Sequence, residues 1–352
     1  MKSFKQFVLE SILDDEDDLA SNDKFIIEEF LKKNYMPPKN GFVINDDNTV
    51  DVKGDLILKS KELEYLTNGF FKFNKVDGFF SIELSNIKSL EGGPRIVVKD
   101  FLCNWCKNLT SLEGAPEMLG KAGLKNKSTF NCSNCENLKS LKGIPSRSIN
   151  STTPTFNIRA SFNESLTSID LDYIKELNGS LYLEMNQNLS SLKGCPQNVY
   201  YFLCTSCDGL KDLVGAPKKC NRFNASGCDN LLNLKGCPEV SSFGELSFTS
   251  CRRLKSLEGA PKECNTLDIS YCNELENFIG APQKITQVFA NYCRGLKTFE
   301  GLDEVDMLWC KNCVNLGLDV LPSKGIKHIV VGPAKQSLKN ELNELGYSAS
   351  EK

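Results

Sequence analysis

The sequence has little of what enzymes use for catalysis, since His328 is the only histidine among 352 residues. A Ser/His/Asp or Cys/His constellation would have to include this residue. We interpret it instead as a surface or cap residue near the C-terminal end. No glycine-rich phosphate-binding motif and no metalloprotease helix occur. These absences favour a protein that is not an enzyme and that needs no cofactor.

Long hydrophobic runs and an excess of charge of one sign are also missing. No apolar run reaches the length of a membrane span, and no secretory signal with an apolar core begins the sequence. The 42 basic and 45 acidic residues are mixed along the chain and give a net charge of -3. The sequence therefore predicts no membrane partner, no nucleic-acid partner and no secretion by a signal peptide.

What the sequence has in abundance is one repeat. Its clearest copy runs from Phe101 to Pro116 and reads apolar-x-apolar-x-x-Cys-x-x-Leu-x-x-Leu-x-Gly-x-Pro. Further copies occupy 130–145, 181–196, 202–217, 223–238, 246–261 and 267–282, and incomplete ones follow at 288–303 and 308–316. The closing prolines from Pro196 to Pro282 lie 21, 21, 23 and 21 residues apart. Such a period marks a solenoid, in which each coil packs on its neighbours.

The spacing within a repeat predicts the shape of one coil. The opening apolar-x-apolar is a short strand with both apolar side chains on one face. The chain then turns at a corner, where most copies have cysteine, and two leucines return to the interior. Gly-x-Pro makes the next turn, because glycine allows unusual backbone angles and proline fixes φ. Stacked coils should form a parallel sheet on one side and irregular or short 3-10 segments on the other.

This pattern resembles the leucine-rich repeat family, and the Cys-x-x-Leu corner is similar to its cysteine-containing branch. The closing Leu-x-Ser-Leu-x-Gly-Ala-Pro looks like a short repeat met in phage and bacterial proteins. The resemblance covers roughly residues 50–330. It implies an α/β solenoid: a superhelix with a parallel sheet on the concave face, a largely irregular or 3-10 convex side and short helical caps at both ends. It predicts fold rather than function, because this architecture hosts many unrelated partners.

The N-terminal residues 1–20 are interpreted as a leader or flexible segment, with an acidic run over 14–18. The first ten residues resemble the capsid-targeting leader of internal head proteins in large contractile-tailed phages. Those leaders end in a glutamate after which the head-maturation protease cuts. The resemblance implies a processing site between Glu10 and Ser11, and an ordinary N-terminal helix is the alternative.

The remaining organisation follows from helical and repeat patterns. Residues 21–52 should form an N-terminal cap, with a helix over 21–34 whose apolar stripe includes Ile26 and Phe30, and strands at 42–44 and 49–52. The solenoid should span 53–330, with loops bulging at 117–129 and 146–155. Residues 331–352 should form a C-terminal helical cap, with a helix over 336–345 and a tail.

Sixteen cysteines suggest zinc or disulfides at first sight. Cys-x-x-Cys pairs of the zinc-ribbon type occur at Cys103/Cys106, Cys132/Cys135, Cys204/Cys207 and Cys310/Cys313. In the repeat, however, the first cysteine of each pair holds an inward strand position and the second holds the corner. We therefore predict buried, reduced thiols in a reducing compartment and expect no metal. No basic neighbour is placed to lower a thiol pKa.

Strand positions between the inward residues should face the concave sheet surface, where large apolar side chains suggest an interface. They form two groups. The first patch comprises Tyr182, Met185, Tyr201 and Leu203, extended by Phe162; the second patch comprises Tyr271, Phe289, Tyr292, Met307 and Trp309. The alternative for the second patch is that the C-terminal cap or a neighbouring loop covers it.

Together these features predict a non-enzymatic, protein-binding leucine-rich-repeat module of a phage, with a host or virion protein held on the concave sheet. The alternatives are an effector packaged in the phage head and cleaved after Glu10, or a structural or decoration protein of the virion. The expected location is the cytoplasm of a bacterial host or the virion. The sequence does not identify the partner.

Overall fold

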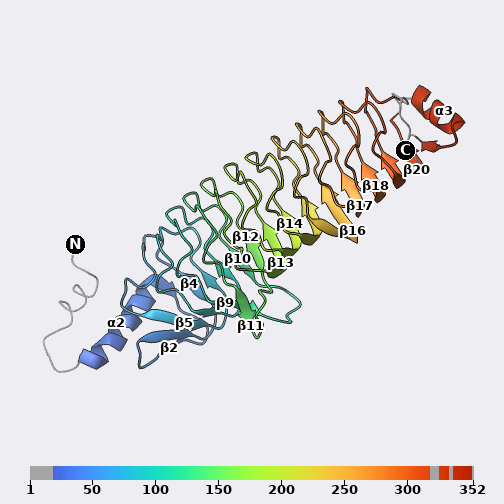
Figure 1. Cartoon of the computed structure of the whole chain (residues 1–352). Coiled ribbons are helices and arrows are strands. Elements are labelled where there is room, and N and C mark those ends of the chain that lie inside the picture. The colour runs from blue at the N-terminus through green and yellow to red at the C-terminus, as the bar shows by residue number, and fades with distance from the viewer. Residues whose placement is uncertain (1–18, 318–324, 333–335, 351–352) are drawn as a thin grey trace. The chain divides into compact units, whose positions relative to one another are not determined.

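The computed structural model describes residues 19–317, 325–332 and 336–350. The chain divides into two compact units, Met1–Ser165 and Leu166–Lys352, which we call unit 1 and unit 2. Both are solenoids built from parallel β-strands, with about 14 turns and two helices in the described parts of the chain (Figure 1). The solenoid predicted from the repeat is therefore confirmed.

Unit 1 contains two sheets. The strands of its first sheet follow the repeats in the order β1 (Tyr35–Met36), β4 (Leu56–Leu58), β6 (Phe80–Ser81), β8 (Phe101–Leu102), β10 (Thr129–Asn131) and β12 (Asn157–Arg159). All neighbours are parallel except β1 and β4. The inward rings of Phe80, Phe101 and Phe130 stack from coil to coil, with centroids 5.2 and 4.9 Å apart. The core of this unit is thus a column of buried side chains.

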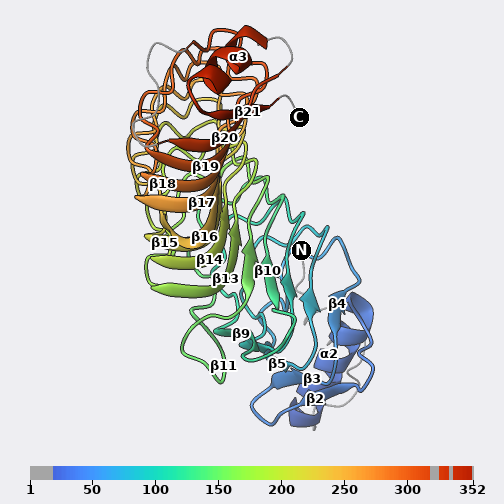
Figure 2. The same ribbon diagram turned by 90° about the vertical axis from the view of Figure 1, so that its right-hand side faces the viewer.

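Unit 1 has a second sheet, and within the coils each of its strands comes just before a strand of the first sheet (Figure 2). Its order is β11 (Arg147–Ile149), β9 (Met118–Lys121), β7 (Ile96–Val97), β5 (Lys72–Val76), β3 (Thr49–Val52) and β2 (Phe42–Ile44). The segments between each corner and the next Gly-x-Pro turn are turns and irregular chain in unit 1, as expected. The loops expected throughout 117–129 and 146–155 are wrong in part, because each contains a strand of this sheet. The strands expected at 42–44 and 49–52 are β2 and β3, and β3 alternates, with Val50 and Val52 buried. The strands that were not expected bury too few apolar side chains for alternation to show. In β9 only Leu119 and Gly120 are buried, and in β11 only Ser148.

The helix expected over 21–34 is α2 (Leu19–Asn34). It buries Ile26, Ile27, Phe30 and Leu31. The ring of Phe30 meets Phe70 and Phe71 edge-on, with centroids 6.1 and 5.7 Å apart. This packing covers apolar side chains of the first coils in unit 1.

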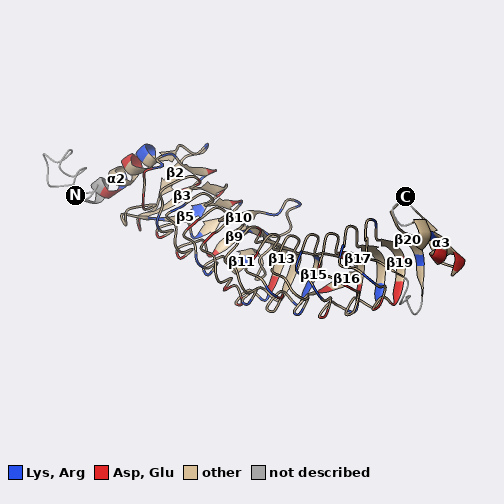
Figure 3. Ribbon diagram, turned by 90° about the horizontal axis from the view of Figure 1, so that it is seen from above, with Lys and Arg blue, Asp and Glu red and all other residues tan. Residues whose placement is uncertain are grey.

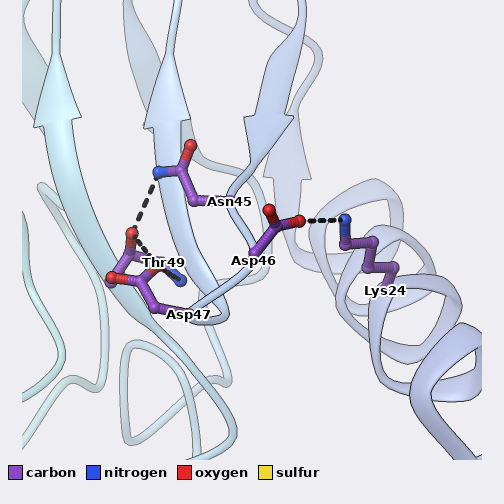
Figure 4. Close-up of polar contacts among 5 residues, drawn as sticks. All are labelled: Lys24, Asn45, Asp46, Asp47 and Thr49. Carbon is purple, nitrogen blue, oxygen red and sulfur yellow. Dashed lines mark hydrogen bonds and ion pairs between the residues drawn. The ribbon is translucent and has the colours of Figure 1, made fainter.

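An ion pair also joins α2 to the turn between β2 and β3 (Figure 4). Lys24 Nζ lies 3.0 Å from Asp46 Oδ1. Within the turn, Thr49 Oγ1 donates to Asp47 Oδ1 at 2.7 Å and accepts from Asn45 Nδ2 at 2.9 Å. These bonds fix the hairpin, although the exposed ion pair itself adds little stability.

Unit 2 has one sheet in the described residues, and its pairs are all parallel. Its order is β13 (Glu176–Tyr182), β14 (Asn198–Leu203), β15 (Lys219–Asn224), β16 (Glu239–Ser247), β17 (Glu263–Asp268), β18 (Lys284–Phe289), β19 (Glu304–Trp309), β20 (Ile326–Val330) and β21 (Ser348–Ser350). The return segments are turns and irregular chain, as expected. Helix α3 (Gln336–Glu344) buries Leu338 and Leu342.

The Gly-x-Pro turn requires its glycine for two reasons. Gly236 has φ +89°, a conformation that other residues resist. A Cβ atom at this position would also lie 2.5 Å from the backbone of Leu213 in the preceding coil. The glycine therefore sets how closely successive coils can stack.

Candidate functional site

The corner cysteines form a ladder of hydrogen bonds along each unit. Each thiol donates to the carbonyl oxygen of an inward strand residue in the preceding coil. In unit 2, for example, Cys207 Sγ lies 3.1 Å from Leu183 O, and Cys228 Sγ lies 3.2 Å from Cys204 O. The same bond is made by Cys106, Cys135, Cys251, Cys272, Cys293 and Cys313. Cysteine at the corner thus supplies a donor for a buried carbonyl that would otherwise need another partner.

The thiols are structural groups rather than reactive ones. All sixteen cysteines are free, and all but Cys237 are buried. The burial agrees with the expectation that these cysteines occupy packing positions of the repeat. Burial raises the pKa of Cys135, Cys207 and Cys272 to about 12. These thiols therefore stay protonated at neutral pH, whereas nucleophiles and metal ligands need the thiolate. Within the described ranges, no group of three or more His, Cys, Asp or Glu residues is placed to hold a metal ion.

The residue just before each corner has a left-handed backbone. Eleven described coils show this, with φ between 53° and 71°, at Leu84, Trp105, Asn134, Phe162, Met185, Ser206, Gly227, Ser250, Tyr271, Tyr292 and Asn312. An L-residue in this region costs roughly 1–2 kcal/mol, and only glycine and, less often, asparagine or aspartate adopt it routinely. Asn134, Gly227 and Asn312 are therefore the sequence signal for this conformation, and the apolar pattern of the repeat does not reveal it.

Several coils place a large side chain at this unfavourable position. The exposed fractions are 45% for Trp105 and 49% for Phe162 in unit 1, and 39% for Met185, 45% for Tyr271 and 42% for Tyr292 in unit 2. These side chains are only partly packed, so the core does not require them. Residues in strained conformations concentrate at functional sites, where the surrounding structure holds them in place.

The second patch lies on the outward face of β18 and β19, where Phe289, Met307 and Trp309 stand, and on the turns after β17 and β18, which hold Tyr271 and Tyr292. The rings of Tyr271 and Tyr292 stack with centroids 4.8 Å apart and an interplanar angle of 3°. Phe289 and Trp309, which are paired across β18 and β19, stack at 4.4 Å and 10°. Met307 is half-buried and lies two residues before Trp309 on the same strand. The structure therefore arranges four of the five predicted residues as two stacked pairs. The tyrosine pair stays open to solvent among the described residues.

The first patch is smaller. Tyr182 pairs with Leu203 across β13 and β14, and Tyr201 lies on the same strand as Leu203. Met185 follows three residues after Tyr182 at a left-handed position. Tyr200, which the sequence analysis did not select, is 43% exposed and packs on Tyr201 with centroids 4.3 Å apart. A hydrogen bond between these two hydroxyls raises the pKa of Tyr201.

Phe162, proposed as an extension of the first patch, belongs to unit 1, whereas the other residues of that patch belong to unit 2. The processing-site residues Glu10 and Ser11 lie outside the described residues. His328 is half-buried on β20, where Nδ1 lies 2.7 Å from Ser348 Oγ and Nε2 lies 3.1 Å from Ser350 Oγ of β21. The contacts of its ring thus serve strand pairing near the C-terminal end.

Charges on unit 2 are of both signs and follow the strands (Figure 3). One such pair joins Arg222 Nε to Glu245 Oε2 at 3.0 Å across β15 and β16, and both side chains are about half exposed. Such pairs contribute at most about 1 kcal/mol. The outward face therefore lacks a strong field of one sign and offers aromatic surface with a mixed polar surround.

Comparison with protein-family models, with curated proteins and with solved structures gives no match. Among the described residues, neither helix is long and apolar enough to cross a membrane. Function must therefore be inferred from the geometry of the outward strand face.

Proposed function

We propose that this chain is a non-enzymatic binding protein that holds a protein partner on the second patch, formed by β18, β19 and the turns after β17 and β18. The observation that carries the proposal is the placement of Tyr271 and Tyr292 at left-handed positions, where each costs roughly 1–2 kcal/mol of backbone energy. Asparagine or glycine holds the equivalent place in other coils without that cost. A partner that buries the two rings would explain why tyrosine is present.

The stacked arrangement suits recognition of a protein surface. Tyrosine and tryptophan supply large contact area while having few rotatable bonds. Because Phe289 and Trp309 already stack on each other, little further conformational entropy is lost when a partner covers them. The mixed charges around the patch provide a polar rim of the kind found at protein interfaces.

The leucine-rich-repeat relationship, the phage origin and a host or virion partner are part of this proposal. The repeat Cys-x-x-Leu-x-x-Leu-x-Gly-x-Pro supports the first. The leader-like first ten residues support the phage origin and the host or virion partner. An effector packaged in the head would use the same strand face after delivery.

The proposal is tested by affinity capture with the full chain and with Tyr292→Ala/Trp309→Asp. The wild type should retain one or more proteins that the double variant loses. A matched control, Tyr182→Ala/Leu203→Asp on the first patch, should keep those proteins. Circular dichroism and urea unfolding must show both variants folded. Identical partner lists for wild type and Tyr292→Ala/Trp309→Asp would refute binding by the second patch.

A further inference from the structure

A groove of about 640 Å³ lies at the beginning of strands β13–β16 in unit 2, away from the second patch. Each of the four strands contributes three consecutive residues. The middle residue of each set is buried and forms the floor, as Val199 and Cys220 do. The first and third residues are exposed and form two rows along the sides.

One end of the groove is marked by an enlarged β-bulge. Cys220 pairs with Val240 and Arg222 pairs with Glu245, so the single residue Asn221 of β15 faces four residues of β16, 241–244. This insertion is the reason for the 23-residue step between Pro238 and Pro261. Bulges redirect side chains and are common beside functional sites.

The bulge presents Phe243 to solvent with 86% of its surface exposed, the highest value among the large hydrophobic residues described. The core does not need this ring, and the insertion is held by close packing. A Cβ atom at Gly244 would lie 2.6 Å from Val240 Cβ and 3.0 Å from Asn221 O. The local backbone is thus built to display a phenylalanine two residues beyond Ser241, the last groove residue of β16.

The lining of the groove has the chemistry of a site for a neutral polyhydroxylated ligand. One row contains Glu176, Asn198, Lys219 and Glu239, and the other contains Asn178, Tyr200, Asn221 and Ser241. Amides and hydroxyls both donate and accept hydrogen bonds, as sugar hydroxyls do. Two carboxylates against one ammonium group disfavour nucleic acids and other polyanions. The exposed rings of Tyr200 and Phe243 offer flat apolar surface for the C–H face of a sugar.

The spacing of the coils decides between a sugar chain and a polypeptide. Neighbouring parallel strands lie about 4.8 Å apart, which is close to the advance per residue of an extended β-linked glycan. Successive coils would then meet successive sugars with the same pair of side-chain positions. An extended polypeptide advances about 3.3 Å per residue, so the spacing of its residues would not match the spacing of the coils.

From these observations we infer that the groove binds an extended, neutral, β-linked oligosaccharide, one sugar per coil. Tyr200 stacks on a sugar within the groove and Phe243 stacks on one at its end. This site is separate from the proposed protein-binding face.

The test is binding of the full-length protein to an array of glucan, mannan, xylan and chitin hexasaccharides, all β-linked, followed by titration calorimetry on the best one. At least one should bind, and Phe243→Ala and Tyr200→Ala should each weaken it about tenfold, the effect of losing one aromatic contact. Phe243→Ala removes an exposed ring, so the fold is retained. The control Tyr292→Ala on the second patch should leave glycan affinity unchanged.

Three results would overturn this inference. They are failure of every β-linked hexasaccharide to bind, wild-type affinity in both groove variants, or displacement of the glycan by unrelated extended peptides at equal concentration. The last result would make the groove a polypeptide site.

Discussion

The left-handed backbone before each corner makes a sharp prediction about stability at Tyr292. In ordinary strands, glycine is less stable than alanine by roughly 0.5–1 kcal/mol because of its larger backbone entropy. At φ 61°, alanine carries a penalty of roughly 1–2 kcal/mol that glycine avoids. Tyr292→Gly and Tyr292→Ala both lose the stack on Tyr271, so the energy of the stack cancels when the two variants are compared. Tyr292→Gly should therefore be more stable than Tyr292→Ala by about 1 kcal/mol.

The measurement is urea unfolding followed by circular dichroism, with midpoints compared at equal m-value. For m of about 1–3 kcal/mol/M, the expected difference between the variants is roughly 0.3–1 M. Phe289 serves as the matched control, because it is on the same face but has no left-handed backbone. There Phe289→Gly should be less stable than Phe289→Ala. The same order of stability at both positions would refute the account of strain at Tyr292.

Three further predictions concern the thiols, the bulge and the N-terminus. Burial raises the pKa of Cys272 to about 12, against about 8.5 for an unfolded thiol. Below about pH 8.5 the thiols are protonated in both the folded and the unfolded protein, and their contribution to stability is complete. As the pH rises from about 8.5 toward 12, the unfolded thiols ionise while the buried ones do not, so the urea concentration at the unfolding midpoint should decrease. A midpoint that does not change with pH would contradict this. Gly244→Ala should destabilise by about 1–3 kcal/mol through overpacking, whereas Ser242→Ala on the same bulge should leave the urea midpoint nearly unchanged. Mass spectrometry of protein from phage particles should find Ser11 as the first residue if the leader is processed, and a start at Met1 would contradict that resemblance.

The interior of the coils could be predicted from the sequence because many copies agree. A single Cys-x-x-Cys pair, such as Cys204/Cys207, suggests a metal site when it is read alone. Alignment with other coils places Cys204 where Leu183 and Ala225 occur, and this identifies a packing position. The structure confirms that Cys204 and Cys207 are buried and free. Repetition thus separates what stacking requires from what chemistry requires.

Only β2 and β3 of the second sheet of unit 1 could be predicted, as strands of the N-terminal cap; the later strands of this sheet show no apolar alternation. In β11 the buried side chain is Ser148, which gives no apolar pattern. It pairs with β9 of the preceding coil, with a register shift between Arg147 and Ile149. Such pairing between coils leaves no apolar pattern in the sequence of a single repeat.

In the candidate sites too, features shared by many coils could be predicted from the sequence, and features of a single coil could not. The stacked aromatic residues were predicted because they are apolar at outward positions, but their backbone strain becomes visible only in three dimensions. The groove was missed, although the 23-residue step between Pro238 and Pro261 marked its location. In a solenoid, stacking alone would favour identical coils, since each coil meets nearly the same neighbours. The coil with Phe243 departs from the others without filling the core. Tyr292 likewise adds an exposed ring at a strained position that the core does not require. Those two positions are therefore the strongest places to look for ligands of this protein.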